Sequence, residues 1–232
     1  MGKVIVITGA SDGIGKQIAL RLAKEGTKLA LIGRDIDRLA AVGQTARDNG
    51  SPMVQTYACD LRQTPELEQV VDKILSDFWY VDVLINNAGV WQKVMPIDQI
   101  SEDVINEVIE TNLLAVMHLT RLLLSTLRTR EEAAILNVIS KSGIVAQKWQ
   151  SAYTASKYGL RGFSEVLRAD LDDTNVKVAS IYQSGTNTKM FEKTWENFPV
   201  EKFTNPEDLA DVVAYILSRP SKIRLYDVRI EK

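Results

Sequence analysis

The chain has 232 residues, of which 45% are hydrophobic and 25% are charged, and its formal net charge at pH 7 is −2. This is ordinary globular composition, and the length suits a single α/β domain spanning residues 1–232. Acidic and basic residues are mixed along the chain, which gives no basic patch for nucleic acid or an anionic membrane. One cysteine and one histidine exclude an intrachain disulfide, a multi-histidine metal site and a histidine-based catalytic triad, and we expect no metal.

Short aliphatic and β-branched runs alternate along the chain with stretches of helical apolar spacing. This alternation predicts a doubly wound parallel sheet of about seven strands, with helices on both faces and right-handed crossovers. The predicted strands are Val4–Thr8, Leu29–Ile32, Val54–Ala58, Val83–Asn86, Ala134–Val138, Val176–Ile181 and a last one near Tyr226–Ile230. The predicted helices include Leu67–Phe78, Glu102–Leu127, Ala152–Leu171 and Pro206–Leu217.

The first predicted strand runs into a glycine-rich turn and then into a helix. The turn has GxxxGxG spacing, not the commoner GxGxxG. A strand, a glycine turn and a helix form the context that a dinucleotide site requires, because glycines let the backbone approach a pyrophosphate at the helix N-terminus. A turn without any ligand is the alternative. The residues that would bind the dinucleotide are Gly9, Ser11, Asp12, Gly13, Ile14 and Gly15.

Tyr153 and Lys157 are four residues apart in a predicted helix, which places both side chains on one face, one turn apart. A free tyrosine titrates near pH ~10 and is a poor acid or base at neutral pH. A nearby ammonium favours the phenolate and lowers the pKa by roughly 1–3 units. The pair is therefore suited to general acid–base chemistry near neutral pH.

These features belong to a set of motifs that follow one another in a fixed order: Thr8–Gly15, Asn86-Asn87-Ala88-Gly89, Asn112, Ser140, and Tyr153 with Lys157. On these motifs the chain resembles the short-chain dehydrogenase/reductase family, from Val4 to about Val228. The resemblance implies a Rossmann-type fold and a nicotinamide cofactor. It also implies an oxidoreductase that interconverts a carbonyl and a secondary alcohol by hydride transfer, with Tyr153 and Lys157 as catalytic residues that also contact the cofactor.

The end of the second predicted strand bears on the choice of cofactor. Proteins that bind NAD usually place a carboxylate there, which accepts from the ribose 2′-hydroxyl. This chain has Gly33 at that position, and Arg34 follows, whose guanidinium can bind a 2′-phosphate. The arrangement resembles the NADP-using members of the family and favours NADP(H). Asp35, if it points into the pocket, makes NAD(H) plausible, and Asp12 in the glycine turn weakens the preference for NADP(H).

Two further cofactor contacts follow from the resemblance. After the third strand, Asp60 would accept from the adenine amino group and Leu61 would flank the ring; the alternative for Asp60 is a helix N-cap. After the fourth strand, Asn87, Ala88 and Gly89 would lie along the cofactor, with Asn87 bracing neighbouring backbone.

The resemblance also assigns the chemistry. Tyr153 would protonate the carbonyl oxygen, and Ser140 would hydrogen-bond the same oxygen, with Ser142 as the competing candidate. Lys157 would lower the pKa of Tyr153 and bind the nicotinamide ribose. Asn112, in mid-helix, would hold a water that links Lys157 to solvent, or would be a plain polar helix residue.

One segment departs from the family pattern. Gln183 and Ser184 stand where Pro and Gly are usual after the sixth strand, and Gly185 is a possible compensation. Thr186 and Thr188 are still expected to contact the nicotinamide end. The altered turn favours an alternative function, an NADP-binding sensor or scaffold without turnover, whereas the retained catalytic residues favour an enzyme.

The stretch Lys189–Phe203 follows the sixth strand and is expected to form a lid over the substrate. Its apolar members are Met190, Phe191, Trp195 and Phe198, and Trp91 and Trp149 are further candidates to line the pocket. The substrate is expected to be a small carbonyl or alcohol. The run Pro206–Ile230 resembles the branch that oxidises small 3-hydroxy acids, and a broad-range carbonyl reductase is the other reading.

The predicted helices Glu102–Leu127 and Ala152–Leu171 are those through which relatives form dimers or tetramers, so a homodimer or homotetramer is expected. No nucleic-acid partner is expected, because the chain has no basic patch. No membrane partner is expected, because no apolar run approaches the ~20 residues of a membrane span. The first predicted strand begins at Val4, which leaves no room for a signal peptide, and a cytoplasmic location is expected.

Overall fold

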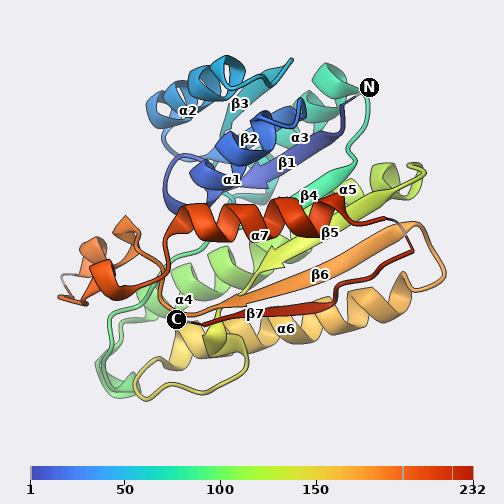
Figure 1. The fold of residues 1–232 in the computed structure, drawn as a ribbon. Coiled ribbons are helices and arrows are strands. Elements are labelled where there is room, and N and C mark those ends of the chain that lie inside the picture. The colour runs from blue at the N-terminus through green and yellow to red at the C-terminus, as the bar shows by residue number, and fades with distance from the viewer. Residues whose placement is uncertain (1, 195, 221, 232) are drawn as a thin grey trace.

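The computed structural model describes residues 2–194, 196–220 and 222–231, and it shows seven parallel strands between two layers of helices (Figure 1). The strand order β3-β2-β1-β4-β5-β6-β7 reverses direction between β1 and β4, where an open α/β sheet binds its ligands. The predicted Rossmann-type sheet is therefore confirmed. The strands are β1 Val4–Thr8, β2 Lys28–Gly33, β3 Val54–Ala58, β4 Val83–Asn86, β5 Ala133–Val138, β6 Val176–Gln183 and β7 Asp227–Ile230.

Helices cover both faces of the sheet, with α1, α2 and α7 on one face and α3, α5 and α6 on the other (Figure 1). The predicted single helix Glu102–Leu127 is in fact three segments, because a π-helical turn at Glu110–Leu114 separates α4 from α5. The helices are α1 Gly13–Ala23, α2 Ile36–Asp48, α3 Thr64–Phe78, α4 Glu102–Ile109, α5 Ala115–Arg128, α6 Ser151–Asp170 and α7 Pro206–Ser218.

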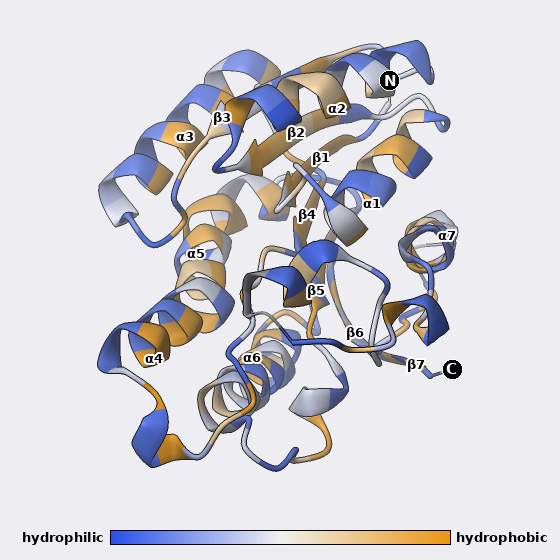
Figure 2. Ribbon diagram, turned by 90° about the vertical axis from the view of Figure 1, so that its left-hand side faces the viewer, coloured by the Kyte–Doolittle hydropathy of each residue, from blue (hydrophilic) through white to orange (hydrophobic). Residues whose placement is uncertain are grey.

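The core forms on both sides of the sheet because successive strand residues point to opposite faces. In β1, Val4 and Val6 pack with α3 and α5, whereas Ile5 and Ile7 pack with α1 and α7. All of these β1 side chains are at most 1% exposed. Strands covered on both faces read as continuous apolar runs, and Figure 2 shows them as hydrophobic ribbons between helices with hydrophilic outer surfaces.

Strand β6 extends two residues beyond its predicted end at Ile181, through the segment that departs from the family pattern. Gln183 pairs with Ile230 of β7, and the Ser184 amide donates to the Ile230 carbonyl at 3.0 Å. A proline at position 183 would have no N–H and would fix φ, whereas Gln183 lets the ladder continue. The substitution therefore replaces a turn with additional sheet.

The helical stretch Glu102–Arg128 is long and apolar enough to cross a membrane, judged by length and composition alone. Its residues Leu119, Leu123 and Leu127 are at most 1% exposed and pack in the core beneath the sheet. Core helices commonly pass the same test, so this stretch is weak evidence for a membrane span.

Candidate active site

The predicted site residues come together at the carboxyl ends of β1, β4 and β5, beside the point where the strand order reverses. At this edge Asn87 binds the end of β1, since its Nδ2 donates to the Thr8 carbonyl at 2.9 Å and to the Gly9 carbonyl at 3.3 Å. Thr8 Oγ1 accepts from the amides of Asn87 and Ala88, both at 3.0 Å. Asn87 thus braces neighbouring backbone as expected, and the two loops form one rigid platform.

The glycine turn brings backbone unusually close together at the start of α1. A Cβ on Gly15 would lie 2.3 Å from the Gly9 carbonyl oxygen and 2.5 Å from Asn87 Nδ2, so only glycine fits there. Gly9 and Gly13 have φ values of 64° and 54°, which other residues rarely adopt. Asp12 caps α1 by accepting from the Gly13 amide at 2.8 Å. The geometry fits a pyrophosphate against the helix N-terminus.

The remaining residues of this turn lie beside it. Ser11 is on the side of β2, where its hydroxyl would be 3.4 Å from a Cβ built on Gly33. Ile14 packs on the core of the α1 face. Gly33, at the end of β2 toward which an adenosine ribose would extend, is buried and packs closely against Ser11 and Leu39.

Asp35, whose direction bears on the choice between NAD(H) and NADP(H), caps α2 and accepts from the Arg38 amide at 3.0 Å. Arg38 Nε contacts the same carboxylate at 3.1 Å, and Arg38 also lies 3.4 Å from Asp12. Arg34 is half exposed and pairs weakly with Glu107 at 3.9 Å. Two guanidiniums therefore flank the end of β2. The sequence reasoning missed Arg38, although its place three residues after an N-cap carboxylate is a readable signal.

Asp60 follows β3, and Arg62 binds its carboxylate in a bidentate ion pair whose shortest distance is 2.6 Å. The Arg62 guanidinium lowers the pKa of Asp60. Asp60 is not the N-cap residue of α3, which is Gln63, but its Oδ1 accepts from the Arg62 amide at 3.1 Å and so caps the turn before the helix. Leu61 is partly buried against the core. An adenine contact by Asp60 would have to share the carboxylate with Arg62.

Tyr153 and Lys157 lie on one face of the first turns of α6, and both are buried. Burial raises the pKa of Tyr153 to about 12, against a smaller lowering by the hydrogen bond with Ser140. Burial also lowers the pKa of Lys157 to about 8. Lys157 Nζ lies 5.7 Å from the centre of the Tyr153 ring and donates to the Val138 carbonyl at 3.4 Å. The lowering of the Tyr153 pKa by Lys157 that the sequence led us to expect is absent, and burial raises the pKa instead.

Ser140 is the serine that faces Tyr153, whereas the Ser142 hydroxyl donates to Gln150 at 3.3 Å. Ser140 Oγ also accepts from the Ser142 amide at 3.1 Å. The backbone φ of Ser140 is 146°, a region that residues other than glycine rarely occupy. Strain of this kind persists where the surrounding structure imposes it, and it occurs here at the residue that is hydrogen-bonded to Tyr153.

Asn112 lies fully buried in the π-helical turn and binds the strand-end loop across the site. Its Oδ1 accepts from the Val90 amide at 2.8 Å, and its Nδ2 donates to the Val90 carbonyl at 3.0 Å and to Ser156 Oγ at 3.2 Å. The side chain therefore anchors backbone and is not a plain polar helix residue. A Cβ on Gly89 would lie 3.3 Å from Asn112 Oδ1 and 3.6 Å from Lys157 Nζ, which explains the glycine.

The two residues after Val90 also contact the catalytic helix, and the sequence reasoning did not identify Gln92. Gln92 is 1% exposed; its Oε1 accepts from the Tyr153 amide at 2.8 Å and its Nε2 donates to the Trp149 carbonyl at 3.3 Å. The Trp91 ring packs edge-on against Tyr153 with centroids 4.6 Å apart. These contacts join residues about sixty positions apart in the chain, so no local sequence pattern predicts them.

Thr186 and Thr188 follow β6 on the opposite side of the site. Thr186 is buried and pairs with Thr204 in an isolated bridge. The methyl group of Thr188 would be 3.2 Å from a Cβ on Gly13, which places it directly against the glycine turn. A Cβ on Gly185 would lie 2.8 Å from the Phe203 ring, so this glycine lets the lid pack close to the strand end.

The predicted lid contains short 3-10 turns at Lys189–Thr194 and Val200–Lys202 and projects beyond the carboxyl ends of the strands (Figure 1, orange). A cavity of about 480 Å³ lies between it and the glycine turn, lined by Gly13, Thr188 and Phe198 among others. Trp195, one of the expected lid residues, is outside the described residues. Trp149, which has a φ of 63°, is half exposed beside the site.

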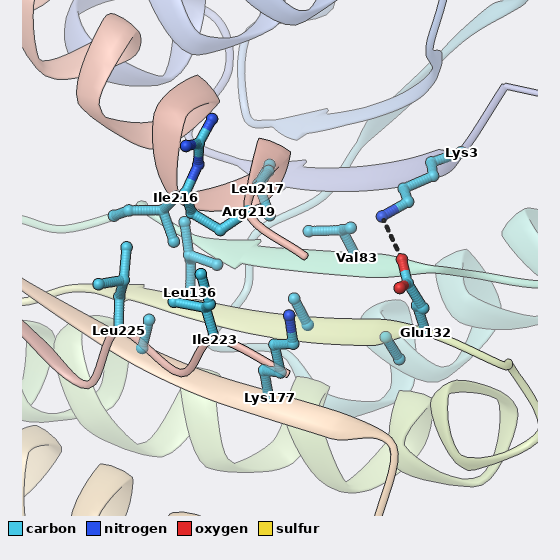
Figure 3. Close-up of a pocket in the computed structure, with 13 residues that line it drawn as sticks. Lys3, Val83, Glu132, Leu136, Lys177, Ile216, Leu217, Arg219, Ile223 and Leu225 are labelled. Carbon is cyan, nitrogen blue, oxygen red and sulfur yellow. Dashed lines mark hydrogen bonds and ion pairs between the residues drawn. The ribbon is translucent and has the colours of Figure 1, made fainter. Parts of the chain in front are cut away.

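A second, smaller cavity of about 30 Å³ lies at the opposite, amino-terminal edge of the sheet (Figure 3). Val83, Leu136 and Ile216 line it, and Lys3 pairs with Glu132 at its rim at 3.3 Å. Its size is that of about one water molecule. It lies at the starts of the strands, away from the platform that carries Tyr153.

A glycine turn at a helix N-terminus, placed beside a buried tyrosine and lysine at the switch point of the sheet, defines the class of nicotinamide-dependent oxidoreductases. The model of the family described as short chain dehydrogenase matches residues 3–198. The chain belongs to the short-chain dehydrogenase/reductase family, and the resemblance seen in its motifs is confirmed.

Individual relatives are similar to this chain over nearly its whole length. The chain is 31% identical to an uncharacterised oxidoreductase of Staphylococcus saprophyticus, covering 98% of this chain and 96% of the relative. It is 30% identical to the 3-oxoacyl-[acyl-carrier-protein] reductase of Thermotoga maritima, covering 95% and 92%. The alcohol dehydrogenase of the archaeon Thermococcus sibiricus, solved in complex with 5-hydroxy-NADP, superposes with a TM-score of 0.91 at 28% identity over 99% and 96% of the two chains.

Proposed function

We propose that the protein uses NADP(H) to interconvert a carbonyl compound and a secondary alcohol. The observation that carries the proposal is the buried Tyr153 hydroxyl, hydrogen-bonded by Ser140 and one helical turn from Lys157. When bound, the nicotinamide supplies or accepts the hydride. In the reductive direction Tyr153 donates a proton to the carbonyl oxygen, and Ser140 fixes the position of that oxygen.

The protonation state of Tyr153 fits a proton donor, because a tyrosine with a pKa of about 12 is fully protonated at neutral pH. The raised pKa also makes the phenol a weaker acid than a free tyrosine, so proton transfer depends on groups that stabilise the tyrosinate. Lys157, with a pKa of about 8, carries a proton on most molecules at pH 7 and stabilises the tyrosinate that forms. Asn112 and Gln92 orient the loop and the helix that bring these groups together.

The preference for NADP(H) is supported by the charges at the end of β2. Asp35 caps α2 and is paired with Arg38, whose guanidinium offsets the negative charge of this carboxylate. Arg34 and Arg38 are the cations that a 2′-phosphate would meet. The Thermococcus sibiricus neighbour, whose structure contains 5-hydroxy-NADP, adds support by similarity.

Turnover is tested by following NADPH absorbance with a panel of ketones, comparing the wild-type protein with Tyr153→Phe. We expect the variant to lose at least ~100-fold in kcat, because the proton donor is gone, while its Kd for NADPH changes less than ~2-fold. NADPH binding without turnover of any ketone would contradict the proposal and favour a sensor. A fully active Tyr153→Phe would show that another group is the acid.

The cofactor preference is tested by fluorescence titration of NADPH and NADH against wild type, Arg34→Ala and Arg38→Ala. Each arginine removed is expected to weaken NADPH binding roughly 10-fold and to leave NADH nearly unchanged, because only NADPH carries the 2′-phosphate. Arg121→Ala, an exposed arginine on α5, is the matched control. Equal wild-type affinities for the two cofactors would refute the preference.

A further inference from the structure

Four aromatic side chains form a continuous group over the catalytic tyrosine, here called the aromatic enclosure: Trp91, Phe191, Phe198 and Phe203. Trp91 lies 4.6 Å from Tyr153 between ring centroids and 5.3 Å from Phe191, each time edge-on. Phe191 in turn lies 4.9 Å from Phe198 and 6.0 Å from Phe203. Each of the four is partly accessible. A ligand that reaches the Tyr153 hydroxyl therefore meets aromatic surface as soon as it leaves the reacting oxygen.

A single carboxylate joins this enclosure to the loop after β4. Glu196 Oε2 accepts from Trp91 Nε1 at 2.7 Å and from Thr194 Oγ1 at 2.7 Å, and its Oε1 accepts from the Val94 amide at 3.0 Å. These bonds hold the lid closed on Trp91. They also place the negative charge of Glu196 in the lining of the cavity between the lid and the glycine turn.

Glu196 is the charged side chain that is hydrogen-bonded to a ring of the aromatic enclosure. Within the described part of the chain, the hydrogen bonds and ion pairs of the arginines join other segments and do not reach 189–203. Lys189 lines the cavity on the side of Asp12 and Lys16, next to the glycine turn. A substrate carboxylate would be desolvated against aromatic rings and would face Glu196, both of which disfavour it.

We infer that the site takes an uncharged ketone with an aromatic or alicyclic body, and that Trp91 and Glu196 set this preference against keto acids and 3-hydroxy acids. The inference rests on the proposed function. In the reduction, a hydride passes from NADPH to the carbonyl carbon, the C=O π bond breaks, and Tyr153 gives its proton to the oxygen, so that an alcohol and NADP⁺ result. The aromatic body lies against Trp91 while this happens.

The experiment compares methyl benzoylformate with benzoylformate, two aromatic ketones that differ in an ester or a carboxylate. Their binding to the NADP⁺-loaded protein is measured by calorimetry, because the oxidised cofactor cannot reduce them and binding is read without turnover. We expect the ester to bind at least ~10-fold more tightly than the acid. Equal or tighter binding of the acid would overturn the inference.

Variants assign the preference to its residues. Trp91→Ala is expected to weaken ester binding roughly 10-fold, and Trp91→Phe to restore most of it, because the aromatic face is what the ligand contacts. Trp79→Phe is the matched control, since Trp79 is 85% exposed at the end of α3. Glu196→Gln is expected to narrow the difference between ester and acid by removing the charge. A difference unchanged in Glu196→Gln would refute the role of that carboxylate.

Turnover of the same pair with NADPH separates this inference from the proposed function. If the ester binds selectively and is not reduced, the substrate preference stands and the enzymatic proposal fails. If the acid is reduced with the higher kcat/KM, the enzymatic proposal stands and the preference fails.

Discussion

Lys157 is an ionisable side chain that the fold removes almost completely from water, at 4% exposure. Burial lowers its pKa from 10.5 to about 8. Below pH 8 both the folded and the unfolded chain carry the proton, so the fold bears the full cost of the buried charge. Between pH 8 and 10.5 the folded chain has released the proton and the unfolded chain has not, so stability rises with pH through that window.

A neutral side chain at this position should therefore stabilise the cofactor-free protein while it abolishes turnover. We expect Lys157→Met to raise the free energy of unfolding at pH 7 by up to roughly 3 kcal/mol, with the gain shrinking toward pH 10. Urea unfolding at several pH values measures it. The series stops at pH 10, because the raised pKa of Tyr153 makes stability fall above that value. A variant less stable than wild type at pH 7 would contradict the argument.

Individual residues show which parts of the site could be predicted from the sequence and which could not. The glycine turn and the Tyr153–Lys157 pair are local patterns whose spacing implies their geometry. The direction of the Asp35 carboxylate is also set locally, by the start of α2 at the following residue, although the sequence interpretation did not use this N-cap signal. Gln92 is less predictable still, since its partner amide lies sixty-one residues away. The burial that raises the pKa of Tyr153 likewise depends on the lid and the loop after β4.

At the scale of elements, the N-terminus of α6 is held by a side chain from another loop. Gln150, its N-cap residue, makes no side-chain capping bond, and Gln92 takes the Tyr153 amide instead. Gln92 also fixes Trp149, whose φ of 63° marks a strained turn into the helix. The position of the catalytic hydroxyl is thus set by the loop after β4 as well as by the helix.

Removing this capping contact should impair chemistry more than cofactor binding. We expect Gln92→Ala to lower kcat at least ~10-fold through misplacement of Tyr153, with the Kd for NADPH changed less than ~2-fold. Gln92→Glu keeps the acceptor and should recover most of kcat. Steady-state kinetics with fluorescence titration gives both quantities. Parallel losses in kcat and NADPH affinity in both variants would point to a general structural role.

The element boundaries show which local signals are reliable. Strands β1, β3 and β4 have their predicted bounds, because apolar runs flanked by turn residues mark both ends. The π-helical turn was not predicted, although Asn112 was singled out. Its extra residue is imposed by the bonds from Asn112 to Val90, which exist only once the loop after β4 is in place. The extension of β6 likewise depends on its neighbour β7.

At the scale of the whole molecule, large apolar side chains of the π-helical turn and of helices α5 and α6 are exposed to solvent. Leu114, Met117 and Tyr158 are 41%, 39% and 41% exposed. We propose that this face pairs two copies of the chain, in line with the homodimer or homotetramer expected from the sequence. Apolar side chains on one face are the usual core of such interfaces.

Light scattering after gel filtration tests this assembly against the chain mass of 25.9 kDa. Wild type should elute at two or four times that mass, and Met117→Glu should lower it, because a charge would be buried at the interface. Ile36→Glu, an exposed position on α2, is the control and should leave the mass unchanged. A wild-type mass equal to one chain would refute the assembly.

The overall topology was predictable because alternating strands and helices leave few ways to build a covered parallel sheet. The closure of the lid was not predictable from the sequence, since it depends on a hydrogen bond from Trp91 to Glu196, more than one hundred residues away along the chain. Long-range contacts of this kind give the sequence no local signature.

The bracing of Thr8 by Asn87 has a consequence for how the chain matures during synthesis. Strand β1 leaves the ribosome early, but its neighbour β4 and the amides that complete the platform are translated about eighty residues later. Until then one edge of β1 lacks its neighbouring strand, and the cofactor-binding site is incomplete. We therefore expect nascent chains that end before Gly89 to depend on chaperones and to be unable to bind a dinucleotide. Once β4 has emerged, chaperone dependence should fall and dinucleotide binding should begin at the same chain length.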